Sequence, residues 1–404
     1  MKNTKMPAIR FKGFNDDWEQ RKFSDIAARE SSISTSATDI PSVEYEDVVA
    51  EEGRLNKDIH LKEAVKSGIT FDGSQVLYGK LRPYLHNWLN PDFKGIAVGD
   101  WWVLKPINTD KKFLYRLIQT QQFDNIANQS SGSKMPRADW NLISNSEFMV
   151  PFSKEEQSKI GRYFDSLDHL ITLHQRKLEK IKIMKKSMLE KMFPRDAESI
   201  PKIRFDGYTD DWEQRKLGDI ASSFEYGLNA AAKEYDGENK YIRITDIDDN
   251  THEFLTDNLT SPDIELTGAD NYKLTEGDIL FARTGASVGK SYIYRNSDGL
   301  VYYAGFLIRA RIKEEYDAEF VFQNTLTDRY NKYIAVTSQR SGQPGVNAQE
   351  YAEFEIEVPK KEEQTKIGTY FRNIDHLITL HQRKLEKLKE VKKSLLEHMF
   401  PMEK

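Results

Sequence analysis

Two pairs of near-identical segments recur along the chain in the same order. IRFKGFNDDWEQRKFSDIA, at residues 9–27, returns as IRFDGYTDDWEQRKLGDIA at residues 203–221, and LDHLITLHQRKLEK, at residues 167–180, returns as IDHLITLHQRKLEK at residues 374–387. The stretches that these anchors enclose share almost no sequence. A repeat of this size predicts two copies of one architecture, in which constant parts frame two different variable parts. Such an arrangement is typical of a protein with two recognition heads and not of an enzyme with a single active site.

The composition limits the class of protein. A length of 404 residues suits two globular domains plus connecting elements, at roughly 100–200 residues per domain. Charged residues make up 30% of the chain, which favours large solvated surfaces such as long helices. Cysteine is absent, so disulfides and thiolate metal sites are excluded and a cytoplasmic location is expected. The N-terminal residues lack the apolar core of a signal peptide, and no window approaches the roughly 18 apolar residues of a membrane span.

Charge is distributed unevenly over the four segments that we predict. Residues 1–150 form a first head with net charge 0, and residues 151–194 form a central helix with net charge +4. Residues 195–358 form a second head with net charge −13, and residues 359–404 form a C-terminal helix with net charge +4. Any contact with nucleic acid must therefore rest on local basic patches, because the chain as a whole is acidic.

Both helical segments carry a heptad pattern. Apolar residues alternate in steps of four and three from Ile160 to Met192 and from Ile367 to Met399, and each segment ends at Met-Phe-Pro. The first helix is expected to run from about Lys154 to Phe193, on the order of 60 Å at 1.5 Å per residue. The simplest partner of each helix is the other one, in an antiparallel pair that satisfies a pseudo-twofold relation and places the heads at opposite ends of a rod. The polar residues on this apolar seam are expected to specify register and orientation; they are His174, Lys185, His381 and Lys392.

The variable regions have the pattern of mixed α/β domains. Short β-rich runs with glycine and aspartate turns are followed by helical patterns at Lys111 to Asn128 and at Asp317 to Ala335. The β-rich runs are Ser74 to Tyr78, Gly95 to Leu104, Asp278 to Ala282, Ser291 to Tyr294 and Leu300 to Arg311. The predicted fold class is therefore mixed α/β, with two globular α/β heads separated by a long antiparallel two-helix coiled coil in a pseudo-twofold internal repeat.

The strongest local signal in the second head is a predicted strand followed by a glycine-rich turn, at residues 277–291. A Walker A phosphate loop is excluded, because Gly285 and Gly289 enclose three residues where that motif requires four. The turn is suited to contact phosphate oxygens and base edges of DNA, and the alternative is a solvated hairpin. The candidate DNA-binding residues here are Arg283, Thr284, Ser287 and Lys290.

The corresponding stretch of the first head, residues 72–88, interleaves basic and aromatic residues. Lys80, Arg82 and His86 alternate with aromatic residues that can stack on bases, although aromatic residues beside a strand often belong to the core. Tyr84 and Trp88 could serve in either way. The candidate DNA-binding residues here are Lys80, Arg82 and Tyr84.

A second matched pair of loops precedes the long helices. Residues 130–137 and 338–347 are small, polar and glycine-containing, and their side chains can read base edges, since Gln and Asn pair with adenine and Arg and Lys with guanine. A plain surface loop is the alternative. The candidates are Lys134, Arg137, Gln339, Arg340, Gln343 and Asn347.

The chain contains no recognisable catalytic or metal motif. Asn90-Pro91-Asp92-Phe93 lacks the second proline of the amino-methyltransferase motif, and Pro262-Asp263 with Glu265 lacks the spacing and the lysine of a nuclease site. The eight histidines suit seam or surface positions better than metal ligation. We therefore expect no catalytic residues, no bound metal and no cofactor.

Together these features resemble the specificity subunit of type I restriction-modification enzymes. The resemblance rests on the paired Asp-Asp-Trp-Glu-Gln-Arg-Lys segments at Asp16 and Asp210, the Gly-Asp-Ile-Leu-Phe-Ala-Arg-Thr-Gly run from Gly277, the Ser-Gly loops, and the Glu-Glu-Gln helix starts at Glu155 and Glu362. It covers essentially the whole chain. The first variable region departs most from the pattern, because it has Val-Leu-Tyr-Gly-Lys-Leu-Arg-Pro where the second has the Arg-Thr-Gly run.

The resemblance implies a non-catalytic, sequence-specific DNA-binding subunit. Its heads would be target-recognition domains that each read one half of a bipartite, asymmetric target in double-stranded DNA, and its helical rod would set the spacer. The helices and anchors would dock two methyltransferase subunits, which carry S-adenosylmethionine, and through them ATP- and Mg-dependent restriction subunits. Two alternatives stay open, a coiled-coil protein-interaction scaffold without DNA specificity and a nicking or methylating enzyme in its own right.

Overall fold

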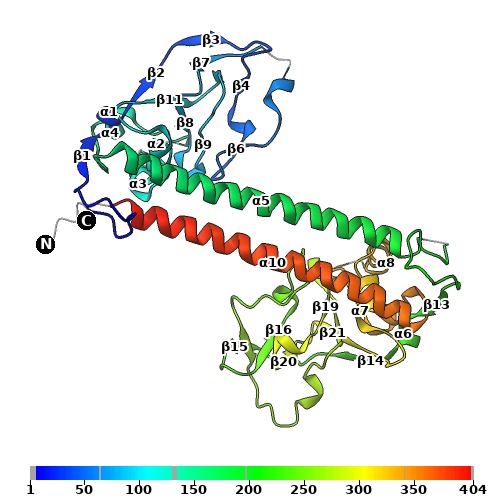
Figure 1. The fold of residues 1–404 in the computed structure, drawn as a ribbon. Coiled ribbons are helices and arrows are strands. Elements are labelled where there is room, and N and C mark those ends of the chain that lie inside the picture. The colour runs from blue at the N-terminus through cyan, green and yellow to red at the C-terminus, as the bar shows by residue number, and fades with distance from the viewer. Residues whose placement is uncertain (1–5, 63–64, 130–133, 196–197, 341, 402–404) are drawn as a thin grey trace. The chain divides into compact units, whose positions relative to one another are not determined.

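The computed structural model describes residues 6–62, 65–129, 134–195, 198–340 and 342–401 and consists of two compact units. Unit 1 comprises residues 1–175 and 384–404, and unit 2 comprises residues 176–383. The two long helices, α5 (Lys154–Met192) and α10 (Lys361–Met399), therefore each contribute one part to each unit (Figure 1). Their bounds agree closely with the predicted ones.

Unit 1 is built on two four-stranded sheets. Its strands are β1 (Glu19–Lys22), β2 (Ala27–Glu30), β3 (Ile33–Thr35), β4 (Ser42–Val43), β5 (Val48–Val49), β6 (Arg54–Leu55), β7 (Ser67–Phe71), β8 (Val76–Gly79), β9 (Trp88–Leu89), β10 (Gly95–Ala97), β11 (Trp101–Pro106) and β12 (Glu147–Val150). One sheet has the antiparallel order β2-β11-β8-β9. The other has the order β3-β7-β10-β4, in which β10 and β4 are parallel. β1 pairs with β12, and β5 with β6.

Unit 2 repeats the first of these sheets and divides the second into smaller pieces. Its strands are β13 (Glu213–Lys216), β14 (Ala221–Tyr226), β15 (Ala232–Glu234), β16 (Lys240–Ile242), β17 (Thr260–Pro262), β18 (Ile279–Ala282), β19 (Ser291–Ile293), β20 (Val301–Tyr303), β21 (Leu307–Ile312) and β22 (Glu355–Val358). The sheet β14-β21-β18-β19 matches β2-β11-β8-β9, and β13–β22 matches β1–β12. β15 pairs with β17, and β16 runs parallel to β20. Two dissimilar sequences thus adopt the same central sheet.

The two predicted helical stretches of the heads are each interrupted. The short helices are α1 (Phe23–Ile26), α2 (Lys111–Leu117), α3 (Gln121–Ala127) and α4 (Trp140–Asn145) in unit 1, and α6 (Leu217–Ile220), α7 (Ala318–Asn324), α8 (Asp328–Thr337) and α9 (Ala348–Ala352) in unit 2. Thr120 and Thr327 start new helices between α2 and α3 and between α7 and α8, because each hydroxyl accepts a hydrogen bond from a backbone N–H three residues later. The helix breaks therefore come from capping threonines.

Within unit 1 the parts of α5 and α10 run antiparallel, as predicted. The Phe164 and Phe400 ring centroids are 6.5 Å apart, and further along α5 the Asp168 carboxylate lies 2.7 Å from Lys392 Nζ. From the first contact to the second, the residue number rises along α5 and falls along the chain of α10, so the two helices run in opposite directions. Ile160 and Phe164, two seam residues of α5, also pack into the hydrophobic core of the head. This part of α5 therefore contacts both α10 and the head.

Unit 2 contains the same contacts shifted by the repeat. Phe193 and Phe371 have ring centroids 5.8 Å apart, and Lys185 Nζ lies 2.5 Å from the Asp375 carboxylate. The seam lysines of the sequence pattern thus each face an aspartate of the other helix. Because Asp168 with Lys392 and Asp375 with Lys185 are the same pair under the repeat, the helix contacts confirm the internal repeat.

The repeated anchors form the base of each unit. Trp18 packs against Phe400 at 6.1 Å between ring centroids, and Trp212 packs against Phe193 at 6.4 Å. The phenylalanine of each Met-Phe-Pro helix end thus covers the tryptophan of the Asp-Asp-Trp motif. The Asp-Asp-Trp segment and the Met-Phe-Pro helix end recur together in the sequence because they contact each other in each unit.

A buried ion pair joins each N-terminal anchor to the start of a long helix. Arg10 donates two hydrogen bonds, of 2.6 and 2.8 Å, to the Glu156 carboxylate, and Arg204 donates two, of 2.7 and 2.8 Å, to Glu363. Both glutamates are fully buried. The Glu-Glu-Gln motif at the helix start therefore has a structural role, since its second glutamate receives the anchor arginine.

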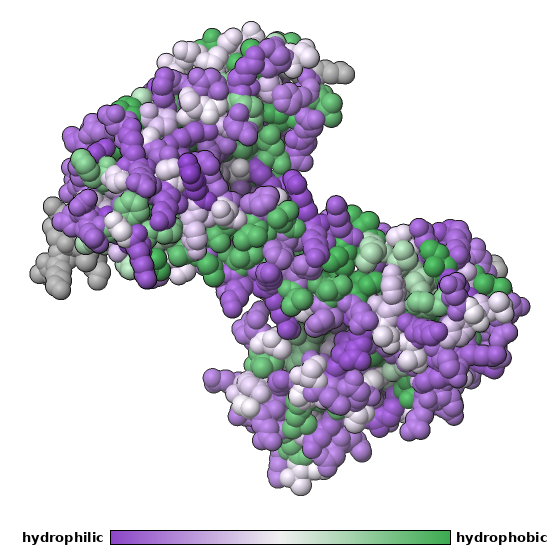
Figure 2. All heavy atoms as spheres, viewed as in Figure 1, coloured by the Kyte–Doolittle hydropathy of each residue, from purple (hydrophilic) through white to green (hydrophobic). Residues whose placement is uncertain are grey.

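Polar residues cover most of the face seen in Figure 2, in keeping with the high charged content. Over the described residues, no helix combines the length and the apolar character that a membrane crossing requires.

Candidate nucleic-acid interface

In unit 1 the two predicted recognition loops pair with each other. The segment that follows β8, residues 80–82, lies against residues 136–138, which precede α4. The Arg82 N–H donates to the Pro136 carbonyl at 2.7 Å, and the Ala138 N–H donates to the Lys80 carbonyl at 2.8 Å. Two stretches more than fifty residues apart in the sequence thus form a single surface at the end of β8.

The corresponding loops of unit 2 pair in the same way. The Gly285 N–H donates to the Pro344 carbonyl at 3.0 Å, and the Val346 N–H donates to the Arg283 carbonyl at 2.9 Å. Lys80 and Arg283 therefore occupy one position of a shared backbone frame, as do Arg82 and Gly285. The two units present different side chains from the same scaffold.

Arg82 has a left-handed backbone at which its counterpart is glycine. The φ angle of Arg82 is 48°, and that of Gly285 is 72°. A residue with a Cβ atom is strained in this region by about 1–2 kcal/mol, whereas glycine is not. The Arg82 side chain is exposed, and no described residue forms an ion pair with it. Strain that is retained at an exposed cation favours a functional role for that cation.

An acid neutralises the basic residues around the frame in unit 1. Asp100 lies 3.5 Å from Lys80 Nζ and receives hydrogen bonds of 3.2 and 3.0 Å from Arg137. The Arg137 hydrogen bonds lower the pKa of the Asp100 carboxyl group. The backbone carbonyl of Asp100 also accepts from the Lys80 N–H at 2.9 Å. The acid is therefore fixed at the edge of the frame.

In unit 2 aromatic rings replace that acid. The Arg283 N–H donates to the Phe306 carbonyl at 3.1 Å, so Phe306 stands where unit 1 has Asp100. The Arg283 guanidinium carbon lies 5.1 Å from the centroid of Tyr226 and 5.6 Å from that of Phe306. Arg283 Nε is buried and has no hydrogen-bond partner among the described residues. Within the described part of the chain, the guanidinium is thus held by two rings and by no carboxylate.

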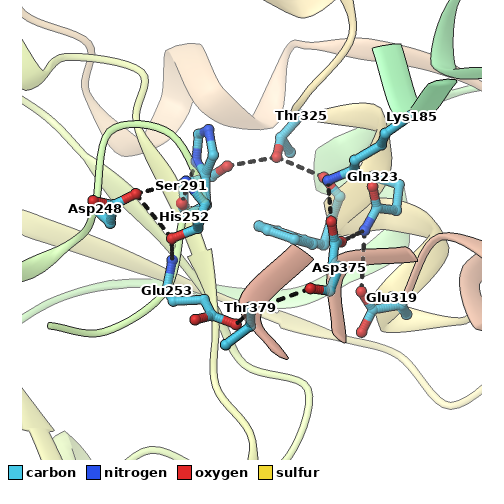
Figure 3. Close-up of polar contacts among 12 residues, drawn as sticks. Lys185, Asp248, His252, Glu253, Ser291, Glu319, Gln323, Thr325, Asp375 and Thr379 are labelled. Carbon is cyan, nitrogen blue, oxygen red and sulfur yellow. Dashed lines mark hydrogen bonds and ion pairs between the residues drawn. The ribbon is translucent and has the colours of Figure 1, made fainter. Parts of the chain in front are cut away.

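A cleft of about 1140 Å³ lies in unit 2 among α5, α8, α10 and residues 249–253 and 286–290. Figure 3 shows its polar wall, in which Asp375 accepts from Lys185 at 2.5 Å and from the Gln323 amide at 2.9 Å. Thr379 of α10 donates to Glu253 at 2.5 Å. In unit 1 the strand position of Ser291 carries Trp88, which is buried. Unit 2 therefore has a small side chain where unit 1 has a buried tryptophan.

His252 on this wall is expected to make unit 2 less stable in acid. Its Nδ1 lies 2.9 Å from the Ser291 carbonyl, and burial, followed by the charge of Lys185, lowers its pKa below the usual 6.5. Below about pH 6.5 the unfolded state therefore binds a proton that the folded state resists, so stability falls with decreasing pH until the folded pKa is reached. His252→Gly is expected to reduce this loss, because it removes the imidazole. Glycine suits the backbone here, since the φ of His252 is 58° and that of Gly53, which lies at the same position of the turn between β5 and β6, is 63°. Urea unfolding at pH 7.5 and 5.5 measures the effect, with the exposed His60→Gln as the control. An unchanged pH dependence in His252→Gly would contradict the assignment.

Comparison with known proteins agrees with these observations. The sequence profile described as "Type I restriction modification DNA specificity domain" matches residues 15–183 and 209–390, one match for each repeat. The chain belongs to the type I restriction-modification specificity family. It is 23% identical over 301 residues to the type I restriction enzyme MjaVIII specificity subunit of Methanocaldococcus jannaschii, covering 72% of this chain and 69% of that one. The predicted family membership is thus confirmed.

Solved structures with similar folds support the same assignment of the architecture. The type I S subunit from M. genitalium has a TM-score of 0.65 at 15% identity and covers 99% of this chain and 100% of that one. A chain from a structure of type I R-M complex assembly and conformational transition has a TM-score of 0.51 at 15% identity and covers 96% and 98%. The mixed α/β fold with two long helices is therefore that of a specificity subunit.

The predicted recognition residues of this specificity subunit differ in accessibility. Exposed side chains are those of Arg82, Tyr84, Lys134, Arg137, Gln339, Arg340, Gln343 and Asn347, while Lys80, Arg283, Thr284, Ser287 and Lys290 are half-buried. Residues 130–133 and 341 of the two Ser-Gly loops lie outside the described residues. Trp88 belongs to the core and stacks on His86, with ring centroids 5.3 Å apart. Tyr84 therefore stays the candidate for base stacking in this loop.

Besides Lys80 and Arg137, which pair with Asp100, three more of the predicted residues have partners in the fold. Lys290 pairs with Asp249 and donates to the Ile247 carbonyl at 3.0 Å. Arg340 pairs with Glu350, and Asn347 caps α9 by accepting from the Glu350 N–H at 2.9 Å. A role in DNA binding stays a prediction for each, and binding would have to compete with these contacts.

Sequence reasoning missed Asp100, Tyr226 and Phe306. Their roles follow from strand pairing, because β11 and β21 place Asp100 and Phe306 beside the loop residue that follows β8 and β18. The separation in sequence, about 20 residues in each unit, carries no motif. The only signal is that Asp100 and Phe306 each lie immediately before a strand.

Proposed function

We propose that this specificity subunit reads a split, asymmetric sequence in double-stranded DNA, with one half-site for each unit. The observation that carries the proposal is the shared frame with different side chains, Lys80, Asp100 and Arg137 in unit 1 against Arg283, Phe306 and Gly345 in unit 2. Equivalent frames would approach DNA alike, because backbone geometry sets the docking. Different side chains would then select different bases.

We further propose that the chain is non-catalytic and holds no cofactor. Its long helices and repeated anchors would dock two methyltransferase subunits, and restriction subunits would join through them. S-adenosylmethionine, ATP and Mg would be bound by these partners. The basic residues of both helix segments, which carry net charges of +4, could also contact DNA phosphates.

A map of methyladenine tests the proposal. Genomic DNA is sequenced from cells that express the cognate methyltransferase subunit with and without this chain. A split motif that occurs only when the chain is present supports the proposal and supplies the target sequence. If no motif depends on the chain although the complex assembles, the proposal fails and a scaffold without DNA specificity takes its place.

Arg82→Gly separates recognition from stability. Glycine relieves the left-handed strain but raises the entropy of the unfolded chain, so we expect the stability of unit 1 to change by less than about 1 kcal/mol. Loss of the exposed cation is expected to weaken binding of the target duplex by the complex about tenfold, which corresponds to about 1.4 kcal/mol. Titration of labelled duplex at several salt concentrations measures the loss. Lys94→Gly, an exposed cation outside the frame and the anchors, is the control. Equal affinity for Arg82→Gly and wild type would contradict the role of Arg82.

A further inference from the structure

Arg283 is the cation of the unit 2 frame that is best prepared to bind a ligand. Tyr226 and Phe306 hold its guanidinium at 5.1 and 5.6 Å from their ring centroids, and both rings are partly exposed, at 44% and 56%. Two flanking rings restrict rotation of the guanidinium and remove water from its faces. The entropy cost of ordering this side chain is therefore largely met before a ligand arrives.

No acid competes for this guanidinium among the described residues. In unit 1 the equivalent Lys80 faces Asp100, but here Phe306 stands in that place. The nearby Arg243 is already bound to Asp246 by two hydrogen bonds of 2.8 Å. Arg283 thus keeps an uncompensated charge and a buried Nε that lacks a partner. An unsatisfied donor of this kind calls for a functional explanation.

A hollow of about 610 Å³ adjoins the clamped arginine. Tyr226, Gly227, Leu228, Arg243, Arg283 and Phe306 contribute to its lining. Gly227 cannot carry a side chain, because a Cβ atom there would lie 2.2 Å from the Ala304 carbonyl oxygen. The hollow is thus a built concavity with aromatic walls and a single uncompensated cation at its edge.

We propose that the clamped Arg283 reads a guanine in the half-site bound by unit 2. The proposal rests on the proposed DNA-reading function and names the base. Guanine presents two acceptors, O6 and N7, at the major-groove edge, and a planar guanidinium matches them with two parallel hydrogen bonds. Adenine and cytosine each place an amino donor there, which a guanidinium cannot accept.

A phosphate contact would not require this construction. A phosphate oxygen is bound by any cation that can reach it, and a flexible lysine serves as well as a fixed arginine. Here the plane of the guanidinium is fixed by rings, and orientation matters most for a ligand that itself has a fixed plane. A base edge meets that condition, so the geometry favours base reading over phosphate binding.

The experiment uses the assembled complex of this chain with its methyltransferase partner. The methyladenine motif is mapped for wild type, Arg283→Gln, Arg283→Lys, Phe306→Asp and Lys233→Gln. We expect Arg283→Gln and Arg283→Lys to relax one guanine position in one half of the motif, with roughly 10- to 100-fold less discrimination there and the other half unchanged. Phe306→Asp transplants the carboxylate of unit 1 next to Arg283 and is expected to weaken the same position. The control is Lys233→Gln, an exposed cation of β15 outside the anchors and the frame, and it should leave the motif unchanged.

Base and phosphate contacts are then distinguished with synthetic duplexes. 7-Deazaguanine at the affected position removes the N7 acceptor and keeps base pairing. It should weaken methylation by the wild-type complex and have little further effect on Arg283→Gln. If Arg283→Gln fails to assemble with its partner, the same 7-deazaguanine measurement is made with Arg283→Lys, which retains the charge.

Several outcomes would overturn the inference. One is a wild-type motif with no G·C pair in the affected half, and another is full rescue by Arg283→Lys with methylation reduced evenly in Arg283→Gln, which is the behaviour of a phosphate contact. An unchanged motif in Arg283→Gln also refutes it. A wild-type complex with no motif at all refutes the proposed function instead, so the two failures are distinguishable.

Discussion

Glu156→Ala is expected to destabilise unit 1 by about 3–5 kcal/mol, the usual cost of removing one partner of a buried ion pair. The Glu156 side chain is 1% exposed and accepts both hydrogen bonds of Arg10, which is itself only 11% exposed. The Trp18 indole N–H also points to this carboxylate, at 3.4 Å. Alanine would leave a buried guanidinium without an acceptor, and charge burial without a partner is costly.

Urea unfolding followed by tryptophan fluorescence measures this loss. Five of the six tryptophans, Trp18, Trp88, Trp101, Trp102 and Trp140, belong to unit 1, so the signal reports mainly on that unit. The matched control is Glu155→Ala, the exposed neighbour in the first turn of α5. Arg10→Met combined with Glu156→Leu should recover much of the loss, because apolar residues can replace a buried pair. Equal unfolding midpoints for Glu156→Ala and Glu155→Ala would show that the pair contributes nothing.

The repeat extends this prediction to unit 2. Glu363→Ala removes the carboxylate that receives Arg204, and Trp212 is the tryptophan that reports on unit 2. We expect a loss of similar size, with Glu362→Ala as the exposed control.

Insertion of one heptad after Lys180 and another after Lys387 is expected to lengthen the spacer of the methylation motif while both half-sites stay the same. Seven residues preserve the face that each helix presents to its partner, because they complete two helical turns. They add about 10 Å to each helix at 1.5 Å per residue, so the spacer should grow by at most about three base pairs. The original motif should then no longer be methylated.

A shorter insertion provides the control for this prediction. Two residues added at both positions turn the seam by about 200°, at 100° per residue, and separate the apolar faces. Such a variant is expected to lose methylation altogether. The methyladenine map distinguishes the variants, and a heptad variant that kept the original spacing would show that the helices do not set it.

Much of the architecture could be predicted because it is written in local or repeated patterns. The heptads of α5 and α10 predicted both helices to within a residue or so, since periodicity and a terminal Met-Phe-Pro are local signals. The anchors predicted two equivalent halves. The strands β8 and β18 and the loops that follow them were predicted from glycine punctuation and β-rich runs.

Contacts between distant segments could not be predicted in this way. Nothing in the sequence indicates that Phe306 faces Arg283, or that Asp100 faces Lys80, because only the pairing of β11 with β8 and of β21 with β18 brings them together. The helix breaks at Thr120 and Thr327 were missed for a related reason, since a threonine caps a helix only where the chain has already turned.

The sequence by itself determined that this protein has two heads on a repeated frame, long helices between constant anchors and the family to which it belongs. Those properties depend on periodicity and recurrence, which are visible one segment at a time. Only the tertiary structure decided which side chains meet at each frame, because strand register places residues side by side whatever their separation along the chain. The difference between an acid beside Lys80 and two rings beside Arg283 is such a property.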